Sequence, residues 1–420
     1  MAATATLDST ARAAVVAACE DVHDAGEGDQ VDGVPTALVA RPTSTEQVSE
    51  VMRAAAAHRL TVVPTGRRTK LTWGRPPTSA DVLLDLSGLD QVLEHAAGDL
   101  IVVTQAGARL SDVQDAVSGS RQVLAVDETV PGASIGGTLA AATSGPGRVA
   151  TGTMRDLLIG LTVVRADGVV AKAGGRVVKN VAGYNVGKLV GGSFGTLAVV
   201  TEALFRLHPL PAVRRWVTVP FADAAEAHRL TQSVLHSQCV ATAVEVDWPA
   251  DGPGSLSVLL AGNEDGVTGR TSTVLALFGA DAREEDTAPA GWSTYPWDLT
   301  ATGDDRSTAL KLTFALSGLP DVLAATRAAD TPVSLRGSAG AGVVYAAIPP
   351  GTGAVVGTVD ALRQVCTRHG GSLVVLDAAA AVKQTVDTWG PIPALELMQR
   401  VKDQFDPDHL LAPGRFVGGI

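Results

Sequence analysis

The segment Pro131-Gly-Ala-Ser-Ile-Gly-Gly-Thr-Leu-Ala140 has three glycines and two small hydroxyl residues within ten positions. Because glycine has no Cβ, a backbone rich in it can closely approach another backbone or a flat ligand, and its amides can reach polar atoms. Related runs follow at Thr143-Ser-Gly-Pro-Gly-Arg148, at Gly152 and between Gly174 and Leu197. We predict that these runs contact one planar ligand. A glycine-rich crossing of strands is the alternative.

The run Pro64-Thr-Gly-Arg-Arg-Thr-Lys70 is a candidate anion-binding loop. It directly follows a predicted buried strand, and a glycine in that place lets successive N–H groups turn toward one point. The two arginines and the lysine add positive charge, and the combination suits a pyrophosphate. The run matches neither GxGxxG nor GxxxxGK[ST], so an ordinary turn is the alternative.

Short β-branched runs alternate with helical segments through the first half of the chain. Ser44 or Thr45 can cap a helix that ends near His58. Farther on, glycine-rich turns separate the β-branched runs, which favours an α+β domain built on antiparallel sheet. We expect strands at 37–40, 61–63, 82–86, 100–104, 161–165, 169–172 and 197–207, and helices at 10–19, 45–58 and 110–117.

The run His208-Pro209-Leu210-Pro211 interrupts this pattern and marks a domain boundary. Beyond it, amphipathic helices alternate with strands, an arrangement that suits a separate α+β cap domain. We expect helices at 222–237 and 320–329, and strands at 255–260, 310–315, 343–348 and 372–376. Residues 280–307 are rich in Asp, Glu, Thr and Pro, and we expect a mobile loop there.

The composition is that of a globular protein with a sizeable core. A chain of 420 residues fits two domains, and 46% hydrophobic residues with 45 glycines indicate buried strands and tight turns. The formal net charge of -11 and the lack of a long Lys/Arg run argue against a general nucleic-acid binder, because phosphate backbones require a basic face.

The cysteines Cys19, Cys239 and Cys366 lie too far apart for a CxxC zinc knuckle or an Fe-S ligand run, so we expect no metal site and a reduced, cytoplasmic setting. The N-terminal residues lack the pattern of a secretory signal. No stretch reaches the roughly 18 uninterrupted apolar residues of a membrane helix. We therefore expect no direct membrane insertion, and a peripheral position at the inner face of a membrane only through a partner.

The order and spacing of these runs resemble the FAD-binding domain of the vanillyl-alcohol oxidase type. The resemblance implies a two-lobed FAD-binding domain followed by an α+β cap domain. It also implies that the loop after the strand holds the FAD pyrophosphate, that the glycine-rich runs approach the ribityl chain and flavin, and that a later strand lies by the adenine. The cofactor-binding residues so implied are Thr65, Gly66, Arg67, Arg68, Thr69 and Lys70 in the loop, Ser134, Gly136, Gly137, Thr143, Ser144, Gly147 and Gly152 in the glycine-rich runs, and Val199 and Val200 in the strand.

A narrower resemblance is to the FAD-binding E subunits of glycolate oxidase. It rests on Lys179-Asn-Val-Ala-Gly-Tyr184, Asp387-Thr-Trp-Gly390, Phe405-Asp-Pro407 and Pro413-Gly-Arg-Phe416. The expected organisation is a helical extension at 1–30, an FAD-binding domain at 31–211, a cap for substrate or partner at 212–390, and a tail at 391–420 that returns to the FAD-binding domain.

Some positions depart from the family pattern. The phosphate loop commonly carries more glycine where this chain has Arg67 and Arg68, and Ala412 stands where Asn often precedes Pro-Gly-Arg. Phe194 replaces the Glu of a Gly-Ser-Glu-Gly-Thr-Leu run of catalytic relatives. No His or Cys lies in or next to the phosphate loop, so we expect non-covalent FAD.

Oxidation of a 2-hydroxy acid needs a cation for the substrate carboxylate and a base for the hydroxyl proton. The catalytic D subunits resemble D-lactate dehydrogenases with a His-x-Gly-Asp-Gly-Asn-x-His motif in the cap, and the eight histidines of this chain are scattered instead. Weak catalytic candidates are Lys179, Tyr184 and Arg336. For Lys179, a buried polar contact near the flavin is an equal alternative.

The resemblance thus implies an FAD-dependent subunit that oxidises a small 2-hydroxy acid, either glycolate or lactate. It would act in a hetero-oligomer with a D-type flavoprotein subunit and an Fe-S subunit that receives the electrons. The alternative is a non-catalytic subunit of the same fold that stabilises the complex or only relays electrons.

Overall fold

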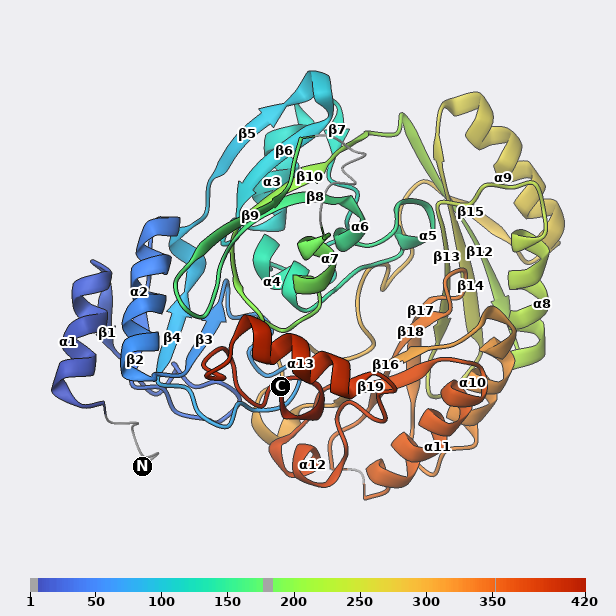
Figure 1. Ribbon diagram of the computed structural model, residues 1–420. Helices are drawn as coiled ribbons and strands as arrows, with labels where there is room; N and C mark the ends of the chain where they lie inside the picture. Colours follow the sequence, from blue (N-terminus) through green and yellow to red (C-terminus); the bar gives the residue numbers. More distant parts are fainter. Residues whose placement is uncertain (1–6, 177–183, 352) are drawn as a thin grey trace. The chain divides into compact units, whose positions relative to one another are not determined.

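The computed structural model describes residues 7–176, 184–351 and 353–420, which form two compact units (Figure 1). Unit 1 comprises the chain up to Thr143, Thr153–Leu210 and Pro391–Ile420, and unit 2 comprises Ser144–Gly152 and Pro211–Gly390. Helices and sheets are mixed in both, which confirms the α+β fold class. The segment from Ser144 to Gly152, expected in the first domain, is grouped with unit 2.

Unit 1 has two lobes, and the first is a small sheet with two helices. The strand order is β1-β2-β4-β3. Ser44 caps the second helix, because its side chain accepts a hydrogen bond from the N–H of Gln47 at 3.2 Å. The elements are α1 (Ser9–Ala18), β1 (Val22–Asp24), β2 (Leu38–Ala40), α2 (Thr45–His58), β3 (Val62–Thr65) and β4 (Val82–Asp85).

From its glycine-rich surroundings, the strand at 82–86 is predicted to join an antiparallel sheet, and this prediction is wrong. The strand is β4, and it pairs in parallel with both β2 and β3. The chain passes from β2 to β3 through α2, and such a helical crossover is the connection that lets two strands run in the same direction.

The second lobe of unit 1 is a five-stranded antiparallel sheet of order β5-β6-β10-β8-β9, packed against short helices. Its core is separate from that of the first lobe and includes Val102, Leu110, Leu139 and Phe205. The elements are β5 (Val92–Ala96), β6 (Ile101–Gln105), α3 (Leu110–Ser118), β7 (Gln122–Val123), α4 (Ile135–Ala140), α6 (Met154–Leu157), β8 (Leu158–Val164), β9 (Val170–Gly174), α7 (Val186–Val190), β10 (Val199–Arg206) and β11 (His208–Pro209).

The C-terminal segment contributes α13 (Leu395–Phe405) to unit 1. Lys402 on this helix has no exposed surface, and its ammonium donates to Asp406 at 2.6 Å, the carbonyl of Thr196 at 2.8 Å and the carbonyl of Leu411 at 2.9 Å. Asp406 also accepts from the backbone N–H groups of Leu410 and Leu411. The buried pair is therefore fully hydrogen-bonded, as a charge removed from water requires.

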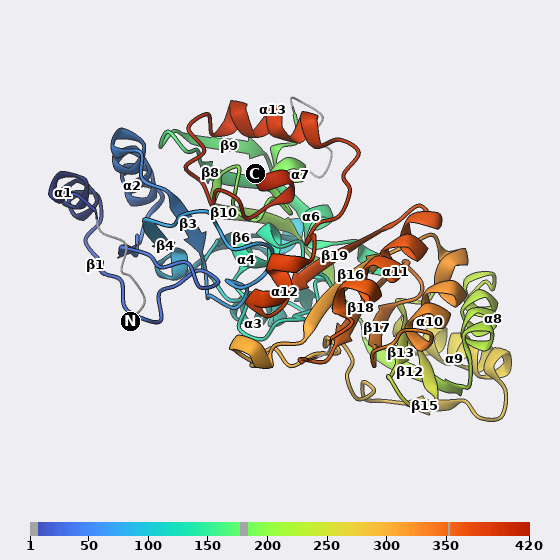
Figure 2. The same ribbon diagram turned by 90° about the horizontal axis from the view of Figure 1, so that it is seen from below.

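Unit 2 is built on an eight-stranded antiparallel sheet of order β15-β12-β14-β13-β17-β18-β16-β19. The helices α8, α9, α10 and α11 lie on one side of this sheet (Figure 2), and alternate strand residues such as Val246, Val258 and Leu310 form the core beneath them. The elements are α5 (Arg148–Thr151), β12 (Val213–Phe221), α8 (Ala224–Leu235), β13 (Ala243–Trp248), β14 (Gly254–Gly262), α9 (Glu264–Phe278), β15 (Arg283–Glu285), β16 (Thr308–Thr313), α10 (Leu319–Arg327), β17 (Ser334–Ser338), β18 (Val343–Ile348), α11 (Val355–Arg368), β19 (Ser372–Asp377) and α12 (Ala380–Thr385).

Unit 2 differs from the sequence-based expectation in its helices, in one loop and in the strands β12, β13 and β17, which were not predicted. The helices α9 and α11 were not predicted, since glycines and β-branched residues weaken their helical pattern, and packing on the sheet stabilises them. The segment 280–307, expected to be a mobile loop, contains β15 and a buried tyrosine, Tyr295, whose ring stacks on Trp297 with centroids 4.5 Å apart.

Replacing Lys402 by Met should strongly destabilise unit 1, because the Asp406 carboxylate stays buried without its counter-charge. We expect a loss of about 3–5 kcal/mol, visible as a lower midpoint of thermal unfolding. Lys188→Met is the matched control, since Lys188 pairs with Asp156 at 2.7 Å on the surface. That change should cost at most about 1 kcal/mol, and equal losses in the two variants would contradict the structural importance of the buried pair.

Candidate functional site

A pocket in unit 1 lies where the loop after β3 faces α4, the start of β10 and the turn before it. The pocket is open to solvent, and its empty space, with the solvent at its mouth included, is about 780 Å³. Both lobes of unit 1 contribute to it. Its lining residues are Pro64, Thr65, Gly66, Arg67, Arg68, Thr69, Lys70, Leu71, Leu86, Ala106, Ser134, Gly136, Gly137, Ala140, Ala141, Val190, Ser193, Phe194, Gly195, Ala198, Val199, Val200 and Arg415.

The loop after β3 offers a row of unpaired donors. Within the described part of the chain, no protein acceptor pairs with the backbone N–H groups of Gly66, Arg67, Arg68, Thr69 or Lys70. Backbone N–H groups need a partner, and such a row in a turn forms a concave site for an anion. The loop thus has the donors that the sequence predicts for a pyrophosphate.

The N-terminus of α4 differs, although the sequence predicts free amides there as well. Its first N–H groups are already used: Ile135 donates to the carbonyl of Ala108 at 2.9 Å, Gly136 to that of Ala106 at 2.7 Å, and Gly137 to the Ser134 hydroxyl at 3.1 Å. The amides of Gly136 and Gly137 thus already have protein acceptors, and the role of these residues in cofactor binding stays a prediction. These glycines line the pocket as surface without side chains.

Close packing explains two of the glycines. A Cβ on Gly66 would lie 2.0 Å from the Ser134 hydroxyl, and a Cβ on Gly136 would lie 2.9 Å from the Cβ of Ala106. The phosphate loop therefore touches the residue that caps α4, and α4 in turn touches the end of β6. Because Gly66 and Gly136 have no side chain, the walls of the pocket can pack directly against each other.

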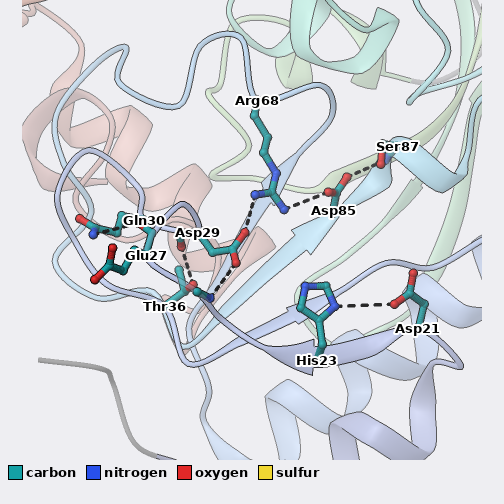
Figure 3. A network of polar contacts seen from close by, with 10 residues as sticks. Asp21, His23, Glu27, Asp29, Gln30, Thr36, Arg68, Asp85 and Ser87 are labelled. Atoms are coloured by element: carbon teal, nitrogen blue, oxygen red, sulfur yellow. Dashed lines mark hydrogen bonds and ion pairs between the residues drawn. The ribbon is translucent and has the colours of Figure 1, made fainter. Parts of the chain in front are cut away.

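The two arginines of the loop are engaged by the protein. Arg67 donates to the carbonyl of Gly107 at 3.0 Å and lies 3.5 Å from Asp90. Arg68 pairs with Asp29 and, at 3.1 Å, with Asp85 (Figure 3). Desolvation acts to raise the pKa of Asp29, but hydrogen bonds from Gly26 and Arg68 and the arginine charge lower it overall. The charges that the sequence assigns to a ligand are thus paired inside the protein.

Lys70 is the cation of the loop without an acidic partner at ion-pair distance among the described residues. Its ammonium lies 3.3 Å from the Thr69 hydroxyl. Burial lowers the pKa of Lys70 to about 8, against the opposing effect of the Glu128 carboxylate. A buried cation of this kind gains from an anionic ligand that restores its solvation.

Most of the predicted cofactor residues line this one pocket, namely Thr65 to Lys70, Ser134, Gly136, Gly137, Val199 and Val200. Thr143 lies outside the lining, and Ser144, Gly147 and Gly152 belong to unit 2, so their contact with the ligand stays a prediction. Sequence reasoning did not assign Phe194 or Arg415 to the pocket. Arg415 donates to the carbonyls of Leu71 and Trp73 at 2.9 and 2.7 Å, which holds the C-terminal segment against the loop.

Of the three catalytic candidates, the structure describes Tyr184 and Arg336, and neither lines this pocket. Lys179 lies outside the described residues. Tyr184 is 98% exposed, and Arg336 in unit 2 is held by Asp247 at 3.1 Å and the Thr294 hydroxyl at 2.8 Å. A catalytic role for any of them stays a prediction.

Among the described residues no group of three or more His, Cys, Asp and Glu could hold a metal ion. In the same part of the chain, no helix has the length and hydropathy to span a bilayer.

Comparison with known proteins identifies the cofactor of this chain. The family model for the FAD binding domain matches residues 36–174, and the model for the C-terminal domain of FAD linked oxidases matches residues 356–416. The chain therefore carries an FAD binding domain and the C-terminal domain of FAD linked oxidases. FAD is its cofactor, and the unpaired amides of the loop and the buried Lys70 ammonium fit the diphosphate of that molecule.

Curated relatives of this chain include glycolate oxidase subunit GlcD of Bacillus subtilis, 30% identical over 217 residues, or 51% of this chain and 46% of the relative. D-lactate dehydrogenase [cytochrome] 1 of Saccharomyces cerevisiae is 35% identical, covering 47% of this chain and 35% of the relative. D-2-hydroxyglutarate dehydrogenase of Xanthomonas citri is 36% identical, covering 41% of this chain and 37% of the relative. The chain spans less than half the length of each of these relatives.

Solved structures show the same fold. An alkyldihydroxyacetonephosphate synthase is 14% identical, with a TM-score of 0.71 over 98% of this chain and 87% of that chain. Xylooligosaccharide oxidase from Myceliophthora thermophila is 15% identical, with a TM-score of 0.68 over 95% and 97%. At these identities the likeness establishes the vanillyl-alcohol oxidase fold alone.

Gly66→Ala should lower FAD retention, because the new Cβ drives the phosphate loop away from Ser134. We expect most of the bound FAD to be lost, measured as the ratio of flavin to protein absorbance after gel filtration. The double variant Gly66→Ala, Ser134→Gly removes both atoms that collide and should recover FAD, at a cost of only a few tenths of a kcal/mol for the weaker cap. Full FAD content in Gly66→Ala alone would show that the loop does not bind the pyrophosphate.

Proposed function

We propose that this chain is an FAD-dependent oxidoreductase subunit that oxidises a small 2-hydroxy acid, with glycolate or lactate as substrate. The names of its relatives support this substrate class, since they include a glycolate oxidase subunit, a D-lactate dehydrogenase and a D-2-hydroxyglutarate dehydrogenase. All three substrates carry a hydroxyl next to a carboxylate. Bound FAD would supply the acceptor for the hydride released from that carbon.

The observation that carries the proposal is the row of unpaired N–H groups from Gly66 to Lys70 beside the Lys70 ammonium. In our proposal this loop holds the FAD diphosphate, Val199 and Val200 lie by the adenine, and the run from Ser134 to Gly137 borders the ribityl chain. Neither His nor Cys occurs among the residues that line the pocket. Because neither side chain is available there for a covalent link to the flavin, we propose non-covalent binding.

The proposed assembly is a cytoplasmic hetero-oligomer of the glycolate oxidase type, in which this chain is the E subunit. Electrons would leave through an Fe-S subunit, and a D-type flavoprotein subunit would complete the complex. A peripheral position at the inner face of the membrane would come through a partner. The E-type assignment rests on the run Lys179 to Tyr184 and the C-terminal motifs.

A second candidate is a non-catalytic subunit that stabilises the complex or only relays electrons. Phe194 favours it, because this aromatic ring lines the pocket where catalytic relatives are expected to carry Glu. The ring stacks on Phe416 with centroids 5.8 Å apart, and the φ of Phe194 is 55°, a left-handed value unusual for a bulky residue. Such a costly conformation is maintained only where the surrounding structure enforces it.

An anaerobic titration of the purified, FAD-loaded chain with glycolate and D-lactate distinguishes the two candidates. We expect the flavin absorbance near roughly 450 nm to bleach with at least one of these acids, and not with acetate, which lacks the hydroxyl. Unchanged absorbance with both hydroxy acids, in a protein that dithionite still reduces, would support the non-catalytic subunit.

The affinity for FAD should fall as pH rises above the pKa of Lys70. The diphosphate favours the protonated ammonium, so the pKa of about 8 in the free protein rises on binding, and binding takes up protons above pH 8. From pH 7 to about 9.5 the Kd should increase up to about thirtyfold, measured by flavin fluorescence. Lys70→Met should bind weakly with little pH dependence, and Lys70→Arg should bind tightly with little pH dependence. A wild-type Kd that is constant with pH would place Lys70 away from the diphosphate.

A further inference from the structure

We propose that Arg68 positions the phosphate loop from behind, as the centre of a clamp with Asp29 and Asp85, and does not itself bind the diphosphate. This inference rests on the proposed function only in assuming that the loop after β3 binds the FAD diphosphate. It assigns a role in cofactor binding to Asp29, a residue of the N-terminal segment for which the sequence predicts no function.

The guanidinium of Arg68 is engaged at both ends. One terminal nitrogen donates to the Asp29 carboxylate and the other to the Asp85 carboxylate at 3.1 Å (Figure 3). The side chains of the two acids are only 16% and 12% exposed, so the ion pairs are shielded from solvent. Pulling Arg68 toward a ligand would break both and leave two carboxylates without their cation.

Both carboxylates are themselves fixed in place. Asp29 accepts a hydrogen bond from the N–H of Gly26 at 2.8 Å, and its own carbonyl accepts from the Thr36 hydroxyl at 2.5 Å. Asp85 ends β4 and accepts from the N–H of Ser87 at 2.9 Å. Arg68 is thus held between two rigid points, one on the N-terminal segment and one on the sheet.

Packing also anchors the N-terminal segment. Val31 is fully buried in a small cluster with Val39, Val63, Leu83 and Ala412, on the sheet that carries the phosphate loop. Asp29 lies two residues from this anchor. Its carboxylate therefore faces Arg68 as part of the folded unit.

The backbone of Arg68 shows what the clamp does. Its φ is 59°, in the left-handed region that residues other than glycine rarely adopt. A left-handed residue within a series of N–H groups turns these groups toward a common side, which is how an anion-binding nest forms. The two ion pairs hold the arginine in this conformation, so they help to aim the unpaired N–H groups on either side of it.

The clamp and simple electrostatics predict opposite changes in FAD affinity when Asp29 or Asp85 is neutralised. Asp29 and Asp85 are negative groups near the proposed diphosphate, so neutralising either should strengthen FAD binding if only charge mattered. If Arg68 bound the diphosphate directly, releasing it from an acid would also strengthen binding. In a clamp, the same change loosens the loop and weakens binding.

The test is an FAD titration of apo-protein carrying Asp29→Asn, Asp85→Asn or Arg68→Met, followed by flavin fluorescence. We expect Kd to rise about ten- to hundredfold in each, the range for loss of hydrogen bonds to a charged group. The double variant Asp29→Asn, Arg68→Met should bind no more weakly than Arg68→Met, because the two changes break the same contact. Asp24→Asn is the matched control: it removes an acid from the N-terminal segment that pairs at the surface with Arg12, and Kd should stay unchanged.

Hydrogen exchange of the apo-protein gives a readout that does not depend on FAD. The Asp29→Asn variant should exchange faster in the peptide around residues 62–73 and at wild-type rates in β6 and β10. Tighter or unchanged FAD binding in Asp29→Asn and Asp85→Asn, or loop exchange at the wild-type rate, would overturn the clamp. If the wild-type chain bound no FAD, the proposed function would fail instead, and the exchange rates would still decide whether the clamp exists.

Discussion

The buried ion pair between Lys402 and Asp406 is the interaction on which unit 1 most depends. The ammonium reaches the carbonyl of Thr196, just after the pocket residues Ser193 to Gly195, and the carbonyl of Leu411, which runs beside β3. One side chain thereby joins the last helix, the turn before β10 and the strand that leads into the phosphate loop. Because a charge stripped of water is stable only when all its hydrogen bonds are met, these segments have little freedom to move separately.

Around the pocket, the arginine side chains and the backbone amides have different roles. Arg67, Arg68 and Arg415 serve the protein itself, through carboxylates or backbone carbonyls. The N–H groups of the loop and the Lys70 ammonium remain for the ligand. The division is physically reasonable, since backbone donors are fixed by the fold and require no ordering when a ligand arrives.

The left-handed positions explain two departures from the family pattern. Arg68 stands where glycine is common, and its φ of 59° is of the kind that glycine adopts at no cost. Ala412 stands where Asn is frequent, and its φ of 43° is again left-handed, a region in which Asn is favoured over other residues with a side chain. In both places surrounding contacts must compensate for the residue, by ion pairs at Arg68 and by complete burial at Ala412.

The sequence by itself determined the fold class, the FAD cofactor and the position of the loop after β3 that lines the pocket, because glycine spacing and strand patterns are local properties of the chain. It also indicated most of the residues that line the pocket. Only the tertiary structure decided which polar groups are available there. The amides of α4 and the side chains of Arg67 and Arg68 bind partners distant in sequence, such as Ala106, Asp90 and Asp29. Lys402 is likewise buried by contacts with residues distant in sequence, which no local sequence pattern predicts. Hydrogen bonding and burial depend on what lies nearby in space, so the folded chain alone distinguishes a donor held for a ligand from one already used.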